Sequence, residues 1–292
     1  MATSVLRRVV VVGTGLVGTS IALALRANGV EVSLVDHEPA AVAMAVRLGA
    51  GVAMADHDPP ADLAVIAVPP SAVVAVLEDA QDRGFARLYT DVAAVKGRLI
   101  GDARRRGCDM VGFVPGHPIY KTTSGSARAD LFHGSAWVLC PEEETCPGAV
   151  EMVEVLVRLC GAEPVVMTGE IHDRATAHSL HVPYLVSSAM AAALVGVDAE
   201  VRRLVGSDVR DVTRLAEAEP ADLIEALTHN AKWVADVLSG IAADLVEVSA
   251  ALQLCGTGDL SFVGQVTDLL HRGNEGRRAL TACGLAPDQG TS

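Results

Sequence analysis

The sequence predicts an α/β protein in which a doubly wound parallel sheet is followed by an all-helical domain. Short β-branched runs alternate with helical stretches over the first half of the 292-residue chain. A glycine pattern stands directly after the first of these runs, and the strand-like runs stop after Thr168. Alternating strands and helices need crossover connections, which favour parallel strands.

The expected strands are continuously apolar, as in strands that are covered on both faces of a parallel sheet. Helical periodicity separates most of them, for example over residues 17–28 and 40–48. In chain order, the expected strands are residues 8–13, 31–36, 63–68, 88–92, 110–114, 136–139 and 164–167.

The second half lacks strand-like runs as far as about residue 273 and has helical stretches at 172–194, 200–204, 221–248 and 260–271. We therefore expect a dinucleotide-binding domain over residues 1–168 and a helical substrate and dimerisation domain over 169–280. The tail "GLAPDQGTS" is typical of a disordered end, and we expect residues 281–292 to be disordered. A helical half this apolar favours a homodimer.

Composition narrows the function classes. The formal net charge of −13 argues against partners such as nucleic acid and anionic membranes, which require basic patches. The longest nearly apolar stretch, residues 182–197, is too short to span a bilayer. The six cysteines lack metal-ligand spacing, so we expect free thiols in a cytoplasmic protein and no metal site.

Gly13, Gly15 and Gly18 form G-x-G-x-x-G between a strand and a helix, and Asp36 ends the next strand. This is the Rossmann-type fingerprint, in which glycines allow a tight turn and close approach of a pyrophosphate to a helix N-terminus. Asp36 suits a ribose 2′-hydroxyl and repels a 2′-phosphate, and His37 follows in place of Arg, so NAD is favoured over NADP. Further expected cofactor contacts are Thr14, Leu16, Val17, Val68 and Pro69.

His117 lies in "GHP", on an expected turn after the apolar run 110–114. The carboxyl ends of parallel strands gather around the ligand in such folds. An NAD enzyme that removes a hydride from a carbon bearing OH or NH₂ must also handle a proton. A neutral imidazole can accept that proton near pH 7, so His117 is the candidate base.

Five blocks, together with the glycine pattern, resemble the prephenate dehydrogenases, a family that includes arogenate and cyclohexadienyl dehydrogenases. The resemblance covers about residues 9–245. The blocks are "TDVAAVKG" (90–97), "GHP" (116–118), "LFHGSAWVLCP" (131–141), "HDRATAHSLHVPYLVSS" (172–188) and "VRDVTRLAEAEP" (209–220).

The resemblance implies oxidative decarboxylation of a small anionic cyclohexadienyl substrate, with hydride transfer from C4 to NAD, loss of CO₂ and aromatisation to 4-hydroxyphenylpyruvate or tyrosine. It also implies that His117 hydrogen-bonds the C4 substituent and that Arg214 binds a substrate carboxylate. Arg210 lies one helical turn before Arg214 and could add a second cation. His181 is implied to line the substrate site.

Three positions depart from the family pattern. Ala94 stands where a Ser hydroxyl is usual, Lys121 lies in a loop that is shorter than usual and lacks its acid, and Tyr184 replaces a second His. One interpretation is drift in an enzyme that acts on prephenate or arogenate. Another is a changed C4 substituent, as in related antibiotic-pathway enzymes that oxidise 4-amino-4-deoxyprephenate to 4-aminophenylpyruvate.

Two competing functions stay open. A 3-hydroxyacid or imine-reductase-like enzyme shares the architecture, but the catalytic Lys or H-x-x-E dyad of such enzymes is missing from residues 172–194. A non-catalytic NAD-sensing protein would fit Ala94 and the altered loop, whereas the joint presence of His117 and Arg214 argues against it.

Overall fold

The computed structural model describes residues 6–120, 125–255 and 263–282. Its contacts divide the chain into two compact units, Met1–Val234 and Ala235–Ser292. The boundary expected at Thr168 falls inside the first unit. Thr168 is the N-cap residue of the helix that follows it, and its hydroxyl accepts a hydrogen bond from the main chain of Ile171.

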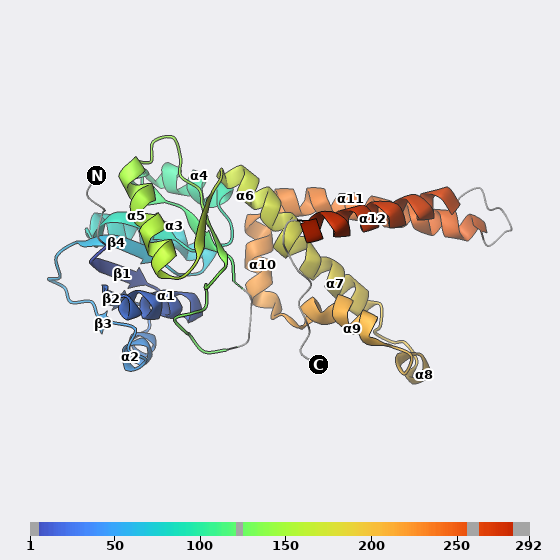
Figure 1. Cartoon of the computed structure of the whole chain (residues 1–292), viewed down its shortest axis with the longest axis horizontal. Coiled ribbons are helices and arrows are strands. Elements are labelled where there is room, and N and C mark those ends of the chain that lie inside the picture. Colours follow the sequence, from blue (N-terminus) through green and yellow to red (C-terminus); the bar gives the residue numbers. More distant parts are fainter. Residues whose placement is uncertain (1–5, 121–124, 256–262, 283–292) are drawn as a thin grey trace. The chain divides into compact units, whose positions relative to one another are not determined.

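Six strands form one sheet in the order β3-β2-β1-β4-β5-β6, and each neighbouring pair is parallel. The chain winds outward in one direction from β1 to β3 and in the other from β4 to β6, so the predicted doubly wound sheet is confirmed (Figure 1). The strands are β1 (Arg8–Val12), β2 (Glu31–Val35), β3 (Val52–Ala53), β4 (Ala61–Ile66), β5 (Ala86–Asp91) and β6 (Phe113–Val114).

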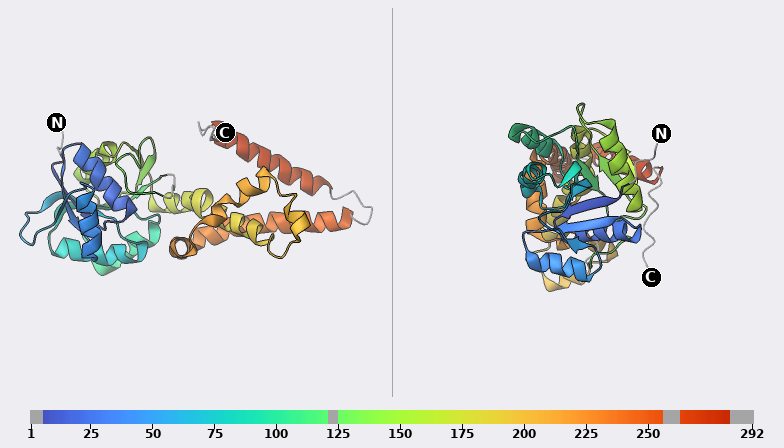
Figure 2. Two further views of the ribbon diagram at one scale, coloured as in Figure 1. Left: turned by 90° about the horizontal axis from the view of Figure 1, so that it is seen from below. Right: turned by 90° about the vertical axis from the view of Figure 1, so that its left-hand side faces the viewer.

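Helices cover both faces of this sheet (Figure 2). Val9 and Val11 belong to one buried cluster, which also holds residues of α1, α2 and α5. Val10 and Val12 point to the opposite face and join a second cluster with α3 and α4. This two-sided burial explains why the strands are continuously apolar. The helices are α1 (Leu16–Ala27), α2 (Pro39–Arg47), α3 (Pro70–Asp82), α4 (Gly97–Arg106) and α5 (Pro147–Leu159).

The expected turn at "GHP" is instead a short strand, β7 (Gly116–Pro118), of a second sheet. In that sheet β7 pairs antiparallel with β8 (Ala136–Leu139), and β8 pairs parallel with β9 (Glu163–Val166). A Cβ on Gly116 would lie 2.9 Å from the main-chain oxygen of Asp91. Gly116 therefore lets this strand approach the end of β5 closely, which the local pattern does not reveal.

Within the described residues, the part of the chain after β9 is helical, as predicted, but two expected helices are interrupted. The stretch 172–194 contains a π-helical segment, Ala177–His181, between α6 and α7. Pro183 stands in the first turn of α7 and lacks a main-chain N–H, which is a usual cause of such irregularity. The stretch 221–248 is divided at Asn230 between α10 and α11.

The elements of this part are α6 (Gly169–Thr176), α7 (Val182–Ala192), α8 (Ala199–Arg202), α9 (Ser207–Thr213), a 3₁₀ turn (Arg214–Glu217), α10 (Pro220–His229), α11 (Ala231–Cys255) and α12 (Val263–Ala282). The helix expected over 260–271 corresponds to α12, which continues to Ala282. Most of the tail expected to be disordered, residues 283–292, lies outside the described residues.

Gly18→Ala should destabilise the protein although alanine favours helices. The new Cβ would lie 1.9 Å from the main-chain oxygen of Gly13, so β1 and α1 would have to move apart. We expect a loss of about 1–3 kcal/mol in the free energy of unfolding, measured by urea titration. Gly15→Ala is the matched control, because its Cβ would meet no protein atom within 4 Å. An equal loss in both variants would contradict the packing argument.

Candidate active site

The glycine turn lies where β1 ends and α1 begins, at the point where the strand order reverses. Gly13 has φ +98°, and a Cβ there would lie 2.3 Å from the main-chain oxygen of Ala67, just after β4. Gly13 and Gly18 are therefore required by the packing of the protein itself. Gly15 is exposed and no protein atom within 4 Å would oppose its Cβ, so the packing of the protein does not require this glycine and the N-terminus of α1 is open to a phosphate.

Asp36 follows β2 and is hydrogen-bonded to the same turn. Its Oδ2 accepts hydrogen bonds from the Thr14 main-chain N at 2.7 Å and the Thr14 hydroxyl at 3.0 Å, and its Oδ1 accepts from Glu38 N at 3.0 Å. Partial burial opposes ionisation, but these hydrogen bonds hold the pKa of Asp36 below its ordinary value. An ionised carboxylate at this place fits a ribose diol and repels a 2′-phosphate.

The remaining expected cofactor contacts lie around this turn. Val68 Cγ1 is 3.1 Å from the position of a Cβ on Gly13, and Pro69 caps the N-terminus of α3. Leu16 and Val17 are the first residues of α1 and are half-buried. A cavity of about 730 Å³ extends from Asp36 along α2. These residues fit a dinucleotide across the switch point of the sheet.

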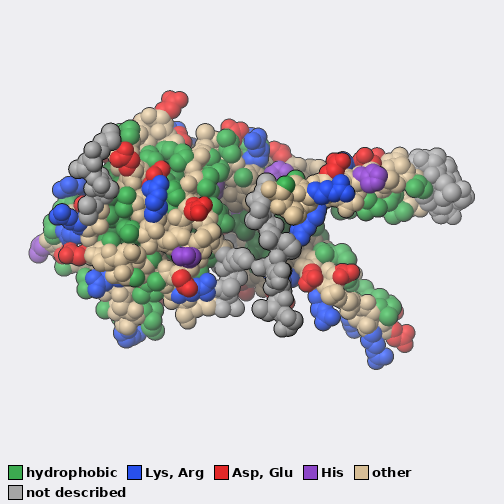
Figure 3. All heavy atoms as spheres, in the orientation of Figure 1, with side chains coloured by type: hydrophobic (Ala, Val, Ile, Leu, Met, Phe, Trp, Pro, Cys, Tyr) green, Lys and Arg blue, Asp and Glu red, His purple; other side chains and the backbone are tan. Residues whose placement is uncertain are grey.

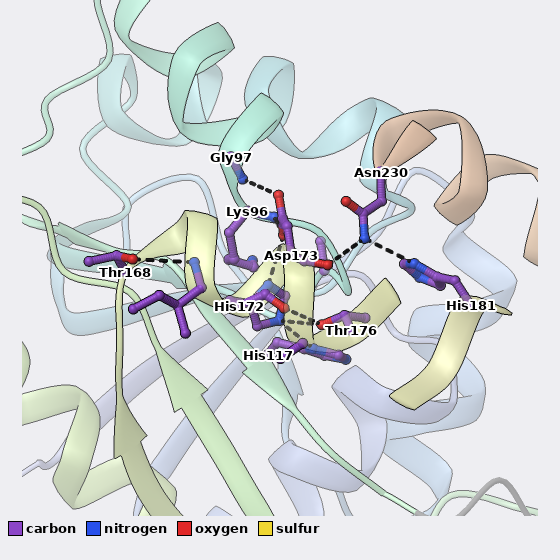
Figure 4. Close-up of polar contacts among 12 residues, drawn as sticks. Lys96, Gly97, His117, Thr168, His172, Asp173, Thr176, His181 and Asn230 are labelled. Atoms are coloured by element: carbon purple, nitrogen blue, oxygen red, sulfur yellow. Dashed lines mark hydrogen bonds and ion pairs between the residues drawn. The ribbon is translucent and has the colours of Figure 1, made fainter. Parts of the chain in front are cut away.

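His117 lies in β7 with only 6% of its surface exposed and contacts a second histidine. Its Nδ1 is 2.9 Å from Nε2 of His172, and the two rings meet edge to face (Figure 4). His172 Nδ1 is 2.8 Å from Oδ1 of Asp173. The Thr176 hydroxyl donates to the main-chain oxygen of His172 at 2.8 Å. A buried chain of polar groups therefore leads from the candidate base to a carboxylate.

The Asp173 carboxylate joins two elements that are distant in sequence. It stands on α6 and accepts hydrogen bonds from the main-chain N of Lys96 at 2.8 Å and of Gly97 at 2.7 Å, at the N-terminus of α4. Sequence reasoning did not assign His172 or Asp173 to the site. The available signal was an acid and a histidine, "HDR" at 172–174, in an otherwise apolar helical stretch.

Lys96 and Asp91 form a fully buried ion pair at 2.5 Å on the other side of this junction. Asp91 also accepts hydrogen bonds from Ala93 N at 2.8 Å and from Gly116 N at 3.1 Å. One carboxylate thus fixes both the segment that contains Ala94 and the strand that contains His117. Ala94 itself is half-buried.

His181, at the end of the π-helical segment, is fully buried and contacts Asn230. The Asn230 Nδ2 donates to the main-chain oxygen of Asp173 at 2.8 Å and lies 3.1 Å from His181 Nδ1. His181 Nε2 and Ser187 Oγ are buried without a hydrogen-bond partner among the described residues. Such atoms point to a polar ligand at this place.

Both site histidines are held neutral. Burial lowers the pKa of His117 well below its ordinary value, and the neighbouring His172, Lys96 and His181 lower it further. Burial also lowers the pKa of His181 to about 4, although Asp173 acts in the opposite direction. An unprotonated imidazole at neutral pH can accept a proton from a bound molecule.

The other predicted site residues lie outside this hydrogen-bonded network. Arg210, in α9, and Arg214, the first residue of the 3₁₀ turn, are exposed, and Tyr184 is half-buried on α7. Lys121 lies outside the described residues. In the described part of the chain, no three His, Cys, Asp or Glu side chains are grouped to hold a metal ion.

The fold and the site define a two-part dehydrogenase with a dinucleotide-binding sheet and a helical second half. The chain belongs to the prephenate dehydrogenase family. The family model "Prephenate dehydrogenase, nucleotide-binding domain" matches residues 21–166, and "Prephenate dehydrogenase, dimerization domain" matches residues 168–262. The chain is therefore an oxidoreductase, and NAD is its cofactor.

Two relatives are similar over most of this chain. The probable prephenate dehydrogenase NovF of Streptomyces niveus is 39% identical over 280 residues, which are 93% of this chain and 76% of that protein. The prephenate dehydrogenase of Bacillus subtilis (strain 168) is 30% identical over 246 residues, which are 78% of this chain and 65% of that protein. This chain thus spans about two thirds of the Bacillus protein.

Two solved structures have the same fold. The Synechocystis arogenate dehydrogenase has a TM-score of 0.76 at 24% identity and covers 93% of this chain and 99% of its own. The prephenate dehydrogenase from A. aeolicus, in complex with hydroxyphenyl propionate and NAD⁺, has a TM-score of 0.78 at 23% identity, with coverage of 94% and 99%.

Asp36→Ala should weaken NADH binding and relax the preference for NAD over NADP. The variant loses the acceptor for the ribose and the charge that repels a 2′-phosphate, so we expect the Kd for NADH to rise about 10–100-fold. Fluorescence titration with NADH and NADPH measures both effects. Glu38→Ala removes an exposed acid two residues away and should change neither affinity. Unchanged NADH binding in Asp36→Ala would exclude the ribose role.

Proposed function

We propose that this enzyme catalyses the NAD-dependent oxidative decarboxylation of a prephenate-type cyclohexadienyl substrate. The observation that carries the proposal is His117, a buried imidazole that is held neutral and follows Gly116, whose main-chain N bonds Asp91 at the carboxyl end of β5. Because the strands are parallel, the carboxyl end of β5 lies at the same edge of the sheet as the glycine turn, with β4 between them. Family membership supports the choice of substrate class.

In the proposed reaction, the C4–H bond breaks with loss of a hydride, which NAD⁺ accepts when bound. The bond between C1 and its carboxylate breaks as well and CO₂ leaves. The electron pair of that bond stays with the ring and completes its aromatic system. His117 accepts the proton of the C4 substituent while C4 gains carbonyl character. It returns the proton as the phenol forms. Burial of the site excludes water and strengthens these polar interactions.

The substrate's negative charge needs donors near the site. His181 has an unpartnered buried nitrogen and is the first candidate. We propose that Arg214 binds a carboxylate through its planar guanidinium, with Arg210 as a second cation and with Tyr184, Lys121 and Ala94 beside the substrate. Both arginines are exposed and available to a ligand or a partner chain.

Ala94 favours a second candidate, 4-amino-4-deoxyprephenate, with 4-aminophenylpyruvate as product. A methyl group at this position removes a hydroxyl that would otherwise bond the C4 oxygen. An amine carries two hydrogens where a hydroxyl has one, so it depends less on a hydrogen-bond donor supplied by the protein at this position. The reaction and the role of His117 are otherwise the same.

The first experiment is NADH formation by the purified protein with prephenate, arogenate and 4-amino-4-deoxyprephenate offered separately. We expect turnover with one of the three, and His117→Asn should lower kcat by about 10²–10⁴-fold while NADH binding is retained. His133→Asn, the same change at an exposed histidine, is the control.

Because the base acts unprotonated, kcat/KM should stay level as pH falls to 6.5 and decline only well below it. NAD binding without turnover on all three would favour the non-catalytic alternative, and unchanged turnover in His117→Asn would exclude the mechanism.

We also propose that the enzyme is a homodimer, as the dimerization-domain match suggests. One segment of the described chain, Ala231–Leu254 of α11, has the length and apolarity of a membrane span, which alone is weak evidence. Its Leu245, Val246 and Leu252 are more than half exposed, and hydrophobic side chains are visible on the surface of this helical part (Figure 3). A partner subunit would cover such a face.

A cytoplasmic location stays a prediction, in keeping with the relatives named above.

Val246→Glu should dissociate the dimer, because two-fold symmetry would bury the new charge twice. We expect the dimer dissociation constant to rise at least about tenfold. Light scattering after size-exclusion chromatography over a concentration series measures it. Val111→Glu places the same charge at an exposed valine of the first unit and should leave the mass unchanged. A monomeric parent protein would refute the proposal outright.

A further inference from the structure

The direction of the hydrogen bonds around His172 follows from the chemistry of its partners. The Asp173 carboxylate already accepts two main-chain N–H groups and has no hydrogen to give, so the proton between it and His172 lies on His172 Nδ1. In neutral His172 the Nε2 then carries a lone pair. The Thr176 hydroxyl donates to the main-chain oxygen of His172, which leaves His117 as the donor to this nitrogen.

His117 therefore carries its hydrogen on Nδ1 and presents an unprotonated Nε2. The bond to His172 is 2.9 Å long and buried, so water does not compete for it. An imidazole fixed in this form can accept a hydrogen from a ligand but cannot donate one.

His181 is fixed in the opposite way. The main-chain oxygen of Asp173 is an acceptor, so the group of Asn230 that faces it must be the NH₂ group. The second hydrogen of that NH₂ group points to His181 Nδ1, which must accept it. The proton of neutral His181 is therefore on Nε2, and this buried N–H has no acceptor among the described residues.

We propose that His172 and Asn230, each hydrogen-bonded to Asp173, are positioning residues for the two site histidines. They set opposite tautomers, so that His117 is a hydrogen-bond acceptor and His181 a donor. Both residues go beyond the expected site, and their roles in turnover rest on the proposed function. The pair selects a ligand that has an O–H or N–H group at one place and a carboxylate or carbonyl oxygen at another. It disfavours a ligand with two donors or two acceptors at these places.

The test is a long-range ¹H–¹⁵N correlation spectrum of the full-length protein labelled with ¹⁵N-histidine, recorded at pH 7.5. Single His→Asn variants at 117, 172 and 181 assign the signals. We expect the Nδ1–H pattern for His117 and His172 and the Nε2–H pattern for His181. An Nε2–H pattern for His117, a doubly protonated His172, or an Nδ1–H pattern for His181 would each overturn the proposal. No turnover is needed, so these outcomes are independent of the substrate experiment.

Variants test the link between tautomer and binding. Asn230→Ala should give His181 a mixed tautomer pattern, leave that of His117 unchanged and raise KM about tenfold or more, with a smaller effect on kcat. His172→Phe keeps a buried ring without the acceptor, so it should lower kcat more than it raises KM and should release the tautomer of His117.

Asn28→Ala is the matched control. Asn28 is also a C-cap asparagine whose NH₂ group bonds two main-chain oxygens, those of Ala24 and Leu159, away from the site. It should leave the histidine signals and KM unchanged. An Asn230→Ala variant that keeps the parent His181 pattern, or an Asn28→Ala variant that shifts it equally, would refute the positioning role. If either site variant does not fold, the parent spectrum alone decides.

Discussion

Asp173 buries a carboxylate at the first turn of α4 and satisfies it with the main-chain N–H groups of Lys96 and Gly97. An ionised group in the interior is tolerated only when it is paired or fully hydrogen-bonded, so α6 must meet α4 at this one position and orientation. The same residue offers its side chain to His172 and its main-chain oxygen to Asn230. The docking of α6 on α4 and the contacts of both site histidines therefore depend on a single residue, His172 through its carboxylate and His181 through its main-chain oxygen and Asn230.

The Lys96–Asp91 pair has a related task on the sheet side. A buried ion pair contributes little net stability because desolvation offsets attraction, while loss of one partner costs about 3–5 kcal/mol. Its value here is geometric: Asp91 bonds both Ala93 N and Gly116 N, and a glycine at 116 allows the strands to approach. The two buried carboxylates thus meet at Lys96, one through its ammonium group and the other through its main-chain N–H.

The parts of the site that follow from local spacing could be predicted from the sequence. The turn from Gly13 to Gly18, its Asp36 partner and His117 all stand at or near strand ends, where periodicity and motif spacing are informative. The network behind them could not, because Lys96 and Asp173 are 77 residues apart and Asp173 and Asn230 are 57 apart. Such contacts depend on helix docking. The π-helical segment Ala177–His181 was missed for a different reason, because the helix expected over 172–194 runs through Pro183, which is a local signal of an interruption.

These contacts change the meaning of Ala94. A serine hydroxyl at that position would help to orient the catalytic imidazole, so its loss first suggests a damaged site. His117 here takes its orientation from α6 through His172, and this support does not pass through residue 94. Under the proposed function, an alanine beside the C4 substituent changes which substituent fits there and leaves the support of the proposed base in place. Substrate choice and proton transfer would then be separate properties of this site, and a change at residue 94 would act on the first.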